Sequence, residues 1–101
     1  MPTVYLTAPP DAADSLATGL VEHRLAACVN RVPCRSTYWW DGEVLDEDEE
    51  LLFAKTTDDR YPDLVRYVKR EHPYDVPCIE RFDESGIDEA FHDWIVAETD
   101  S

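Results

Sequence analysis

Residues 28–57, CVNRVPCRSTYWWDGEVLDEDEELLFAKTT, decide the fold of this protein. β-branched and aromatic residues lead to Asp41-Gly42, a dipeptide typical of two-residue hairpin turns, and a second run of strand formers follows. Each arm can exceed about ten residues, whereas an average strand has five or six. The outer half of this hairpin is therefore expected to project beyond the core of a small protein. Because such a projection has unpaired edges, it indicates pairing with another chain.

The flanking segments predict the remaining elements. We expect strands over 3–8 and 78–82, and helices over roughly 12–26, from Pro62 to His72, and from Ile87 to Ile95. The order βαββαβ, followed by a helix, predicts an α+β fold of the ferredoxin-like class. In that fold two helices pack on one face of a four-stranded antiparallel sheet. We expect residues 1–101 to form a single domain.

Acidic side chains dominate the composition. The chain has 23 Asp and Glu against 9 Lys and Arg, which gives a net charge of −14. Such a surface repels polyanions, so neither nucleic acid nor an anionic membrane is an expected partner. The longest apolar run, 25–29, is far shorter than the roughly 20 residues of a membrane helix, and the amino terminus lacks a signal-peptide pattern. We therefore expect a cytoplasmic protein.

Two interpretations of this acidity remain open. An acidic, lysine-poor surface stays hydrated in concentrated salt, as in proteins from halophiles, because salt screens its self-repulsion. Alternatively, the carboxylates attract specific cations. Since the acids are spread through the whole chain, we favour the first interpretation.

Four motifs resemble the CutA family of divalent-cation tolerance proteins, in the family's order and at nearly its spacing. They are residues 25–30 (LAACVN), 38–42 (YWWDG), 55–56 (KT) and 72–77 (HPYDVP). The resemblance implies a ferredoxin-like subunit and a homotrimer in which long hairpins pair between subunits. It also implies a function in tolerance to copper and other divalent metals.

Three positions depart from the family pattern. Leu6 stands where some bacterial relatives have a cysteine proposed as a copper ligand, Glu71 where a histidine can precede the His-Pro-Tyr motif, and Cys78 where glutamate is expected. The relatives' metal ligands are therefore not carried over to this chain as a set.

The candidate metal ligands are His72, Cys78, Glu80 and Cys28. Cys78 follows His72 by six positions across a proline-bounded loop, and a thiolate beside an imidazole suits copper or another borderline divalent metal ion. The alternative is structural: His72 ends a helix, and the cysteines are small buried side chains. The three cysteines, at 28, 34 and 78, show no zinc-finger spacing.

The aromatic residues Tyr38, Trp39 and Trp40 lie beside the predicted turn. Because so much exposed apolar area is improbable in a monomer, we assign them to the trimer interface. On the nearby acidic strand, Glu47 and Glu49 share one face, which hard cations could bridge, although we expect a solvated face.

A regulatory function is the alternative to metal binding. In that case a trimeric module binds a small metabolite or a partner protein in clefts between subunits, lined by Trp39, Lys55 and Tyr74. An enzyme is not expected, because the sequence has no glycine-rich phosphate loop, no Gly-x-Ser-x-Gly elbow and no evident nucleophile paired with a base.

Overall fold

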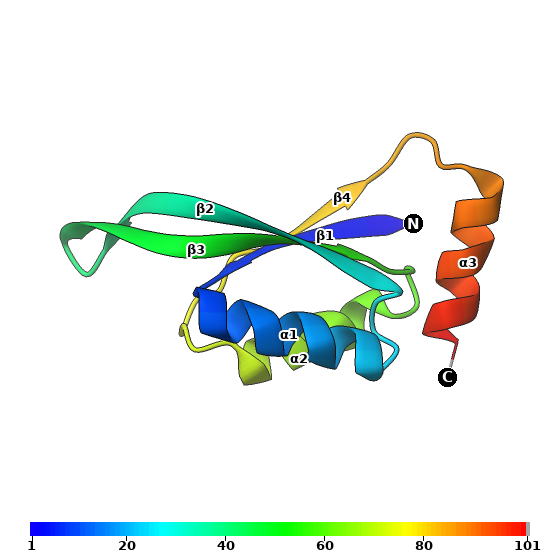
Figure 1. Cartoon of the computed structure of the whole chain (residues 1–101), viewed down its shortest axis with the longest axis horizontal. Coiled ribbons are helices and arrows are strands. Elements are labelled where there is room, and N and C mark those ends of the chain that lie inside the picture. Colours follow the sequence, from blue (N-terminus) through cyan, green and yellow to red (C-terminus); the bar gives the residue numbers. More distant parts are fainter. Residues whose placement is uncertain (101) are drawn as a thin grey trace.

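The computed structural model describes residues 1–100, which form four strands and three helices (Figure 1). The elements are β1 (Pro2–Ala8), α1 (Pro10–Glu22), β2 (Cys28–Trp40), β3 (Glu43–Lys55), α2 (Tyr61–Glu71), β4 (Ile79–Asp83) and α3 (Glu89–Thr99). Their order is the predicted one. No helix in residues 1–100 is both long enough and apolar enough to cross a membrane.

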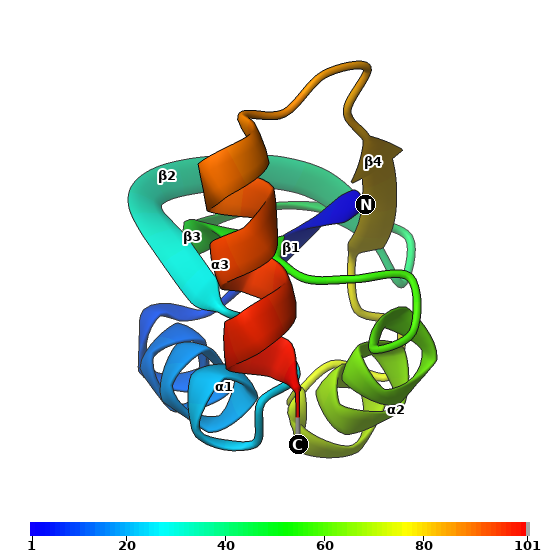
Figure 2. The ribbon, with the colours of Figure 1, turned by 90° about the vertical axis from the view of Figure 1, so that its right-hand side faces the viewer.

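The four strands form one antiparallel sheet in the order β2-β3-β1-β4. Both α1 and α2 lie on the same side of it, whereas α3 stands at one end of the sheet (Figure 2). This is the predicted ferredoxin-like arrangement. The face of the sheet opposite α1 and α2 carries Tyr5, whose ring packs against Phe53 and Phe82. Phe82 remains 54% exposed.

The hairpin has two arms of 13 residues each. Its register runs without a break from the pair Cys28 and Lys55 to the pair Trp40 and Glu43. At the tip Asp41 and Gly42 have φ values of 50° and 79°, as a two-residue turn of the primed type requires. The tip projects well beyond the helices, and the molecule is 45 Å along its longest axis (Figure 1).

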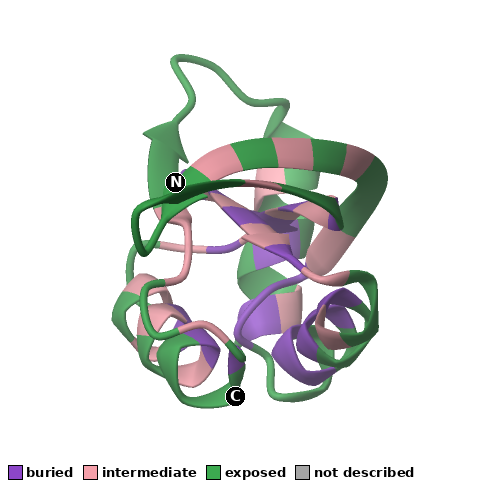
Figure 3. Ribbon diagram, turned by 90° about the vertical axis from the view of Figure 1, so that its left-hand side faces the viewer, coloured by how far each residue is buried: buried purple, intermediate pink, exposed green. Residues whose placement is uncertain are grey.

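The core lies between the sheet and the two helices (Figure 3). Burial alternates along β1, as expected for a strand with one face on a core. The core cluster includes fully buried large side chains from β1, α1, β3 and α2, namely Val4, Leu6, Leu16, Leu20, Leu52, Leu64 and Val68.

Helix α1 differs from the predicted range of 12–26 at both ends. It begins at Pro10, whose fixed φ suits the first helical turn. It ends at Glu22, because the chain reverses at Arg24, which has a φ of 61°. The amide groups of Leu25 and Ala26 then bond to the carbonyl of Leu20, which closes the corner before β2.

Candidate functional site

A groove of about 740 Å³ lies between the outer half of the hairpin and the loop that joins α2 to β4. Its volume is in the range of small-molecule sites. Aromatic and acidic side chains dominate its lining, together with the thiol of Cys78. The aromatic and acidic members are Tyr38, Trp39, Trp40, Glu47, Glu49, Tyr74 and Asp75.

Two tyrosine hydroxyls and two carboxylates are linked inside this groove. The hydroxyl of Tyr38 donates to Oε2 of Glu47 at 3.1 Å. The hydroxyl of Tyr74 lies 3.2 Å from Oε2 of Glu49 and 3.5 Å from Oε2 of Glu47. One phenol proton is therefore shared between two carboxylates from alternate positions of β3.

Glu49 is the more buried of these carboxylates, with only 5% of its surface exposed. In residues 1–100 neither Glu47 nor Glu49 forms an ion pair. Burial raises the pKa of Tyr74, and its hydrogen bond with Tyr38 and the negative charge of Glu49 raise it further. Tyr74 therefore remains a protonated donor to the carboxylates at neutral pH.

Sequence reasoning placed Glu49 beside Glu47 on one strand face, but it did not anticipate that Glu49 is buried. The prediction of a solvated strand face was wrong for this residue, because the loop that carries Tyr74 covers its carboxylate. Alternation along β3 was the available signal, since Glu49 pairs with Cys34 and Glu47 with Ser36, both on the face that bears Tyr38.

His72 holds the loop in place. It ends α2, and its Nε2 lies 2.8 Å from the carbonyl oxygen of Thr7. Its Nδ1 accepts a hydrogen bond of 3.1 Å from the backbone N–H of Tyr74. Because both ring nitrogens are engaged, the structure gives His72 the structural role, and its imidazole has no free nitrogen for a metal.

The other predicted metal ligands lie apart. Cys78 and Glu80 are neighbours, with 3.9 Å between Sγ and Oε1. Cys28 lies elsewhere, paired with Lys55 across the hairpin. Among residues 1–100, no three His, Cys, Asp or Glu side chains form a group that could hold a metal ion. One chain therefore does not assemble the predicted set of His72, Cys78, Glu80 and Cys28.

The chemistry of the two cysteines is that of thiols rather than thiolates. Burial raises the pKa of Cys78, and the nearby charges of Glu80 and Glu49 add to this. Burial also raises the pKa of Cys28, which Lys55 partly offsets. Metal binding at either sulfur would have to displace its proton.

The predicted cleft residues separate into two places. Trp39 and Tyr74 line the groove, although they are 35 positions apart in the sequence. Lys55 lines a smaller cavity of about 150 Å³, near the amino terminus and α3. Its Nζ donates to Oγ1 of Thr3 at 3.2 Å. Within one chain Lys55 therefore lies apart from Trp39 and Tyr74, and their meeting in a cleft between subunits stays a prediction.

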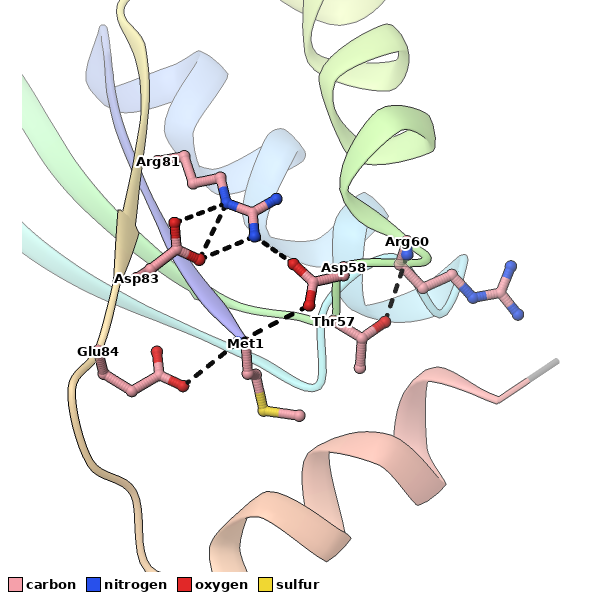
Figure 4. Close-up of polar contacts among 7 residues, drawn as sticks. All are labelled: Met1, Thr57, Asp58, Arg60, Arg81, Asp83 and Glu84. Carbon is pink, nitrogen blue, oxygen red and sulfur yellow. Dashed lines mark hydrogen bonds and ion pairs between the residues drawn. The ribbon is translucent and has the colours of Figure 1, made fainter.

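A second charged cluster lies at the amino-terminal end of β1 (Figure 4). The guanidinium of Arg81 binds the carboxylates of Asp83 and Asp58. The α-amino group of Met1 lies 3.9 Å from Asp58 and 3.8 Å from Glu84. Each member of this cluster faces an opposite charge.

The strand order, the two helices on one face of the sheet and the long hairpin define an α+β protein of the ferredoxin-like class. Residues 2–98 match the model of the family described as CutA1 divalent ion tolerance protein. The chain belongs to this family.

Relatives with similar sequences include divalent-cation tolerance proteins CutA from two thermophiles. The protein from Thermus thermophilus is 44% identical over 94 residues, which cover 91% of each chain. The protein from Pyrococcus horikoshii is 36% identical over 97 residues, which cover 95% of each chain.

Solved structures show the same fold. CutA1 from Pyrococcus horikoshii superimposes with a TM-score of 0.94 at 34% identity over the whole of both chains. A structure described as the PII-like protein CutA from Nostoc sp. PCC 7120 in apo form superimposes with a TM-score of 0.94 at 29% identity. The match covers 99% of this chain and 98% of that one. A CutA protein from Archaeoglobus fulgidus that is described as periplasmic superimposes with a TM-score of 0.93 at 33% identity. The match covers 99% of this chain and 100% of that one.

Proposed function

We propose that this protein serves divalent-cation tolerance in the cytoplasm as a homotrimer whose long hairpins pair between subunits. The observation that supports a trimer is the apolar surface that a single chain leaves exposed to solvent. Trp39 is 74% exposed and Val44 56% exposed at the hairpin tip, and Phe82 is 54% exposed on the uncovered sheet face. Burial of such area in subunit contacts is strongly favourable.

The assembly is tested by sedimentation equilibrium in molar KCl. We expect three times the mass of one chain, and a shift to smaller species in a Trp39→Asp variant. The matched control is Val76→Asp, because Val76 is 70% exposed and lies on the loop rather than on the hairpin. A wild-type protein that sediments as a monomer at micromolar concentration would contradict the proposal.

We further propose copper as the preferred metal, with Cys78 and Glu80 as its ligands on each chain. Their contact of 3.9 Å supports this pair, and copper is the strongest binder among the common divalent ions. Because one chain supplies no group of three ligands in residues 1–100, another subunit or solvent would complete the coordination.

Equilibrium dialysis with reductant against copper, zinc, cobalt and nickel tests this site. Saturable binding of about one copper per subunit is expected, and it should be lost in Cys78→Ser. Cys34→Ser is the matched control, since Cys34 is also half-buried but lies on β2, where its Sγ is 3.9 Å from the hydroxyl of Ser36. Diffuse binding without saturation, or equal binding by both variants, would show that this metal site does not exist.

The second candidate is a regulatory module whose groove binds a small metabolite or a partner protein. One observation favours it specifically: the fold brings Trp39 and Tyr74 to the same groove, beside two carboxylates that form no ion pair in residues 1–100. Tryptophan fluorescence screened against a metabolite panel tests this function. A saturable change with one compound is expected, and a flat response to the whole panel would count against it.

A further inference from the structure

Glu49 is the most buried acidic residue of the groove, and its carboxylate has no positively charged partner in residues 1–100. Only 5% of the Glu49 residue is exposed, and its Oε2 accepts a hydrogen bond from the hydroxyl of Tyr74. No buried side-chain oxygen in residues 1–100 lacks a hydrogen-bond partner, so the second oxygen, Oε1, is accessible from the groove. Neither oxygen has an ion pair within residues 1–100. Buried carboxylates are normally paired with a cation, because desolvation of an isolated charge costs several kcal/mol.

The groove around Glu49 combines negative charge with aromatic walls. Glu47 adds a second carboxylate, and Tyr38, Trp39 and Tyr74 contribute three rings from the hairpin and the loop. Ring faces attract organic cations through the quadrupole of their π-systems, and this attraction strengthens when the site is shielded from water. Carboxylates and aromatic rings in one groove therefore favour a positively charged ligand with apolar substituents.

An organic cation fits this lining better than a metal ion. Hard divalent cations take six or more oxygen ligands, and softer ones need several thiolate or imidazole donors. Among residues 1–100 no group of three suitable donors is present, whereas the groove has room for a molecule of several heavy atoms. An alkylated ammonium group is weakly hydrated and needs no fixed coordination geometry.

We propose that the groove binds a small organic cation of the alkylammonium class. Its charged head lies beside Glu49 and Glu47, against the rings of Tyr38 and Tyr74, and its stem extends along Trp39. The proposal rests on the regulatory function suggested above and names the chemical class of its ligand. Cys78 also lines this groove, and the proposed cation contacts Glu49 and Glu47 rather than the copper ligands Cys78 and Glu80.

Choline is the probe. Its neutral control is 3,3-dimethylbutan-1-ol, in which a carbon atom replaces the quaternary nitrogen of choline. Both are titrated into the full-length protein at constant ionic strength, with tryptophan fluorescence as the readout. We expect a saturable change with choline and none with the alcohol at the same concentrations. No saturable response to choline, or an equal response to the alcohol, would overturn the proposal.

Two glutamine variants locate the bound charge. Glu49→Gln should weaken choline binding by about tenfold, as expected for loss of a buried charged partner. Glu50→Gln removes the same charge from the next position of β3, where the carboxylate binds Arg31 on the opposite face. Its affinity should stay within about twofold of wild type. Equal weakening in both variants would reduce the effect to the general charge of the protein and overturn the proposal.

The metabolite panel separates this proposal from the regulatory function on which it rests. A response to neutral or anionic compounds, without one to choline, would overturn the cation class and leave the regulatory function standing. A flat response to every compound would remove both. Displacement of choline by copper in Cys78→Ser would place a metal at the carboxylates instead, and would also overturn the proposal.

Discussion

The two ends of β1 carry clusters of charge that differ in how they are neutralised. At the amino-terminal end, Arg81 and the Met1 amine face carboxylates on every side (Figure 4). At the other end, Glu47 and Glu49 are hydrogen-bonded by phenols and form no ion pair in residues 1–100. The first cluster contains both signs of charge, whereas the second contains no positive charge from residues 1–100. This difference separates a stabilising cluster from a binding site.

The largest expected effect on stability comes from removing the hydroxyl of Tyr74, which lies within hydrogen-bond distance of both groove carboxylates. Tyr74→Phe removes the hydroxyl that bonds Glu49, and it leaves a buried carboxylate without its donor. We expect the free energy of unfolding to fall by about 1–3 kcal/mol, measured by urea unfolding at fixed protein concentration. Tyr61→Phe is the control, because the Tyr61 ring contact with Arg81 survives the change. An equal loss in both variants would contradict the network.

Ionisation of Tyr74 at alkaline pH tests how much this groove residue contributes to stability. The pKa of Tyr74 is raised, chiefly by burial, so the folded state holds the phenol proton more tightly than the unfolded state does. Stability should therefore be complete below about pH 10 and decline as the pH rises further. Melting temperatures between about pH 9 and pH 12 measure this decline. It should be shallower in Tyr74→Phe, and an unchanged slope would refute the assignment.

Loss of the central cation tests the amino-terminal cluster. Arg81→Gln leaves Asp58 and Asp83 near one another without their guanidinium. Because the side chains of Asp58 and Asp83 are more than half exposed, we expect the melting temperature at low salt to fall by only a few degrees. The difference should shrink in molar KCl, which screens the released repulsion. A deficit that grows with salt would show that Arg81 acts through packing on Tyr61 instead.

Acidic pH gives the smallest effect. Hydrogen bonds from Arg81 hold the pKa of Asp83 below its ordinary value of 3.8. The resulting stability is present above that value and is lost as the pH falls through the lower pKa of the folded state. Asp83→Asn should therefore flatten the acid limb of the melting curve slightly. If the limb stays as steep as in wild type, Asp83 contributes nothing measurable to acid stability.

Most of the fold could be predicted because its signals are local. Asp41-Gly42 fixes the turn, since few residue pairs accept two positive φ values, and alternation along β1 fixes its buried face. The start of α1 was missed because Pro9-Pro10 suggests a break, although Pro10 suits the first helical turn.

The site could be predicted only in part, because it depends on contacts between distant segments. The aromatic motif and the His-Pro-Tyr motif pointed to Trp39 and Tyr74, which do share the groove. The burial of Glu49 depends on a loop that no local pattern places over β3. The register fixed by the turn places Lys55 at the far end of the hairpin from Trp39, so the two can meet only between subunits.

The central claim is that Glu49 is a buried carboxylate whose cationic partner is not supplied by its own chain. The most direct test is the free energy of unfolding of Glu49→Gln, compared with Glu50→Gln, by urea unfolding without added ligand at fixed protein concentration. We predict that Glu49→Gln is more stable than wild type by about 1 kcal/mol, because an unpaired buried charge is removed, while Glu50→Gln, which loses an ion pair with Arg31, gains nothing. A Glu49→Gln variant less stable than wild type would contradict the claim, and would mean that a cation within the assembly already pairs with Glu49.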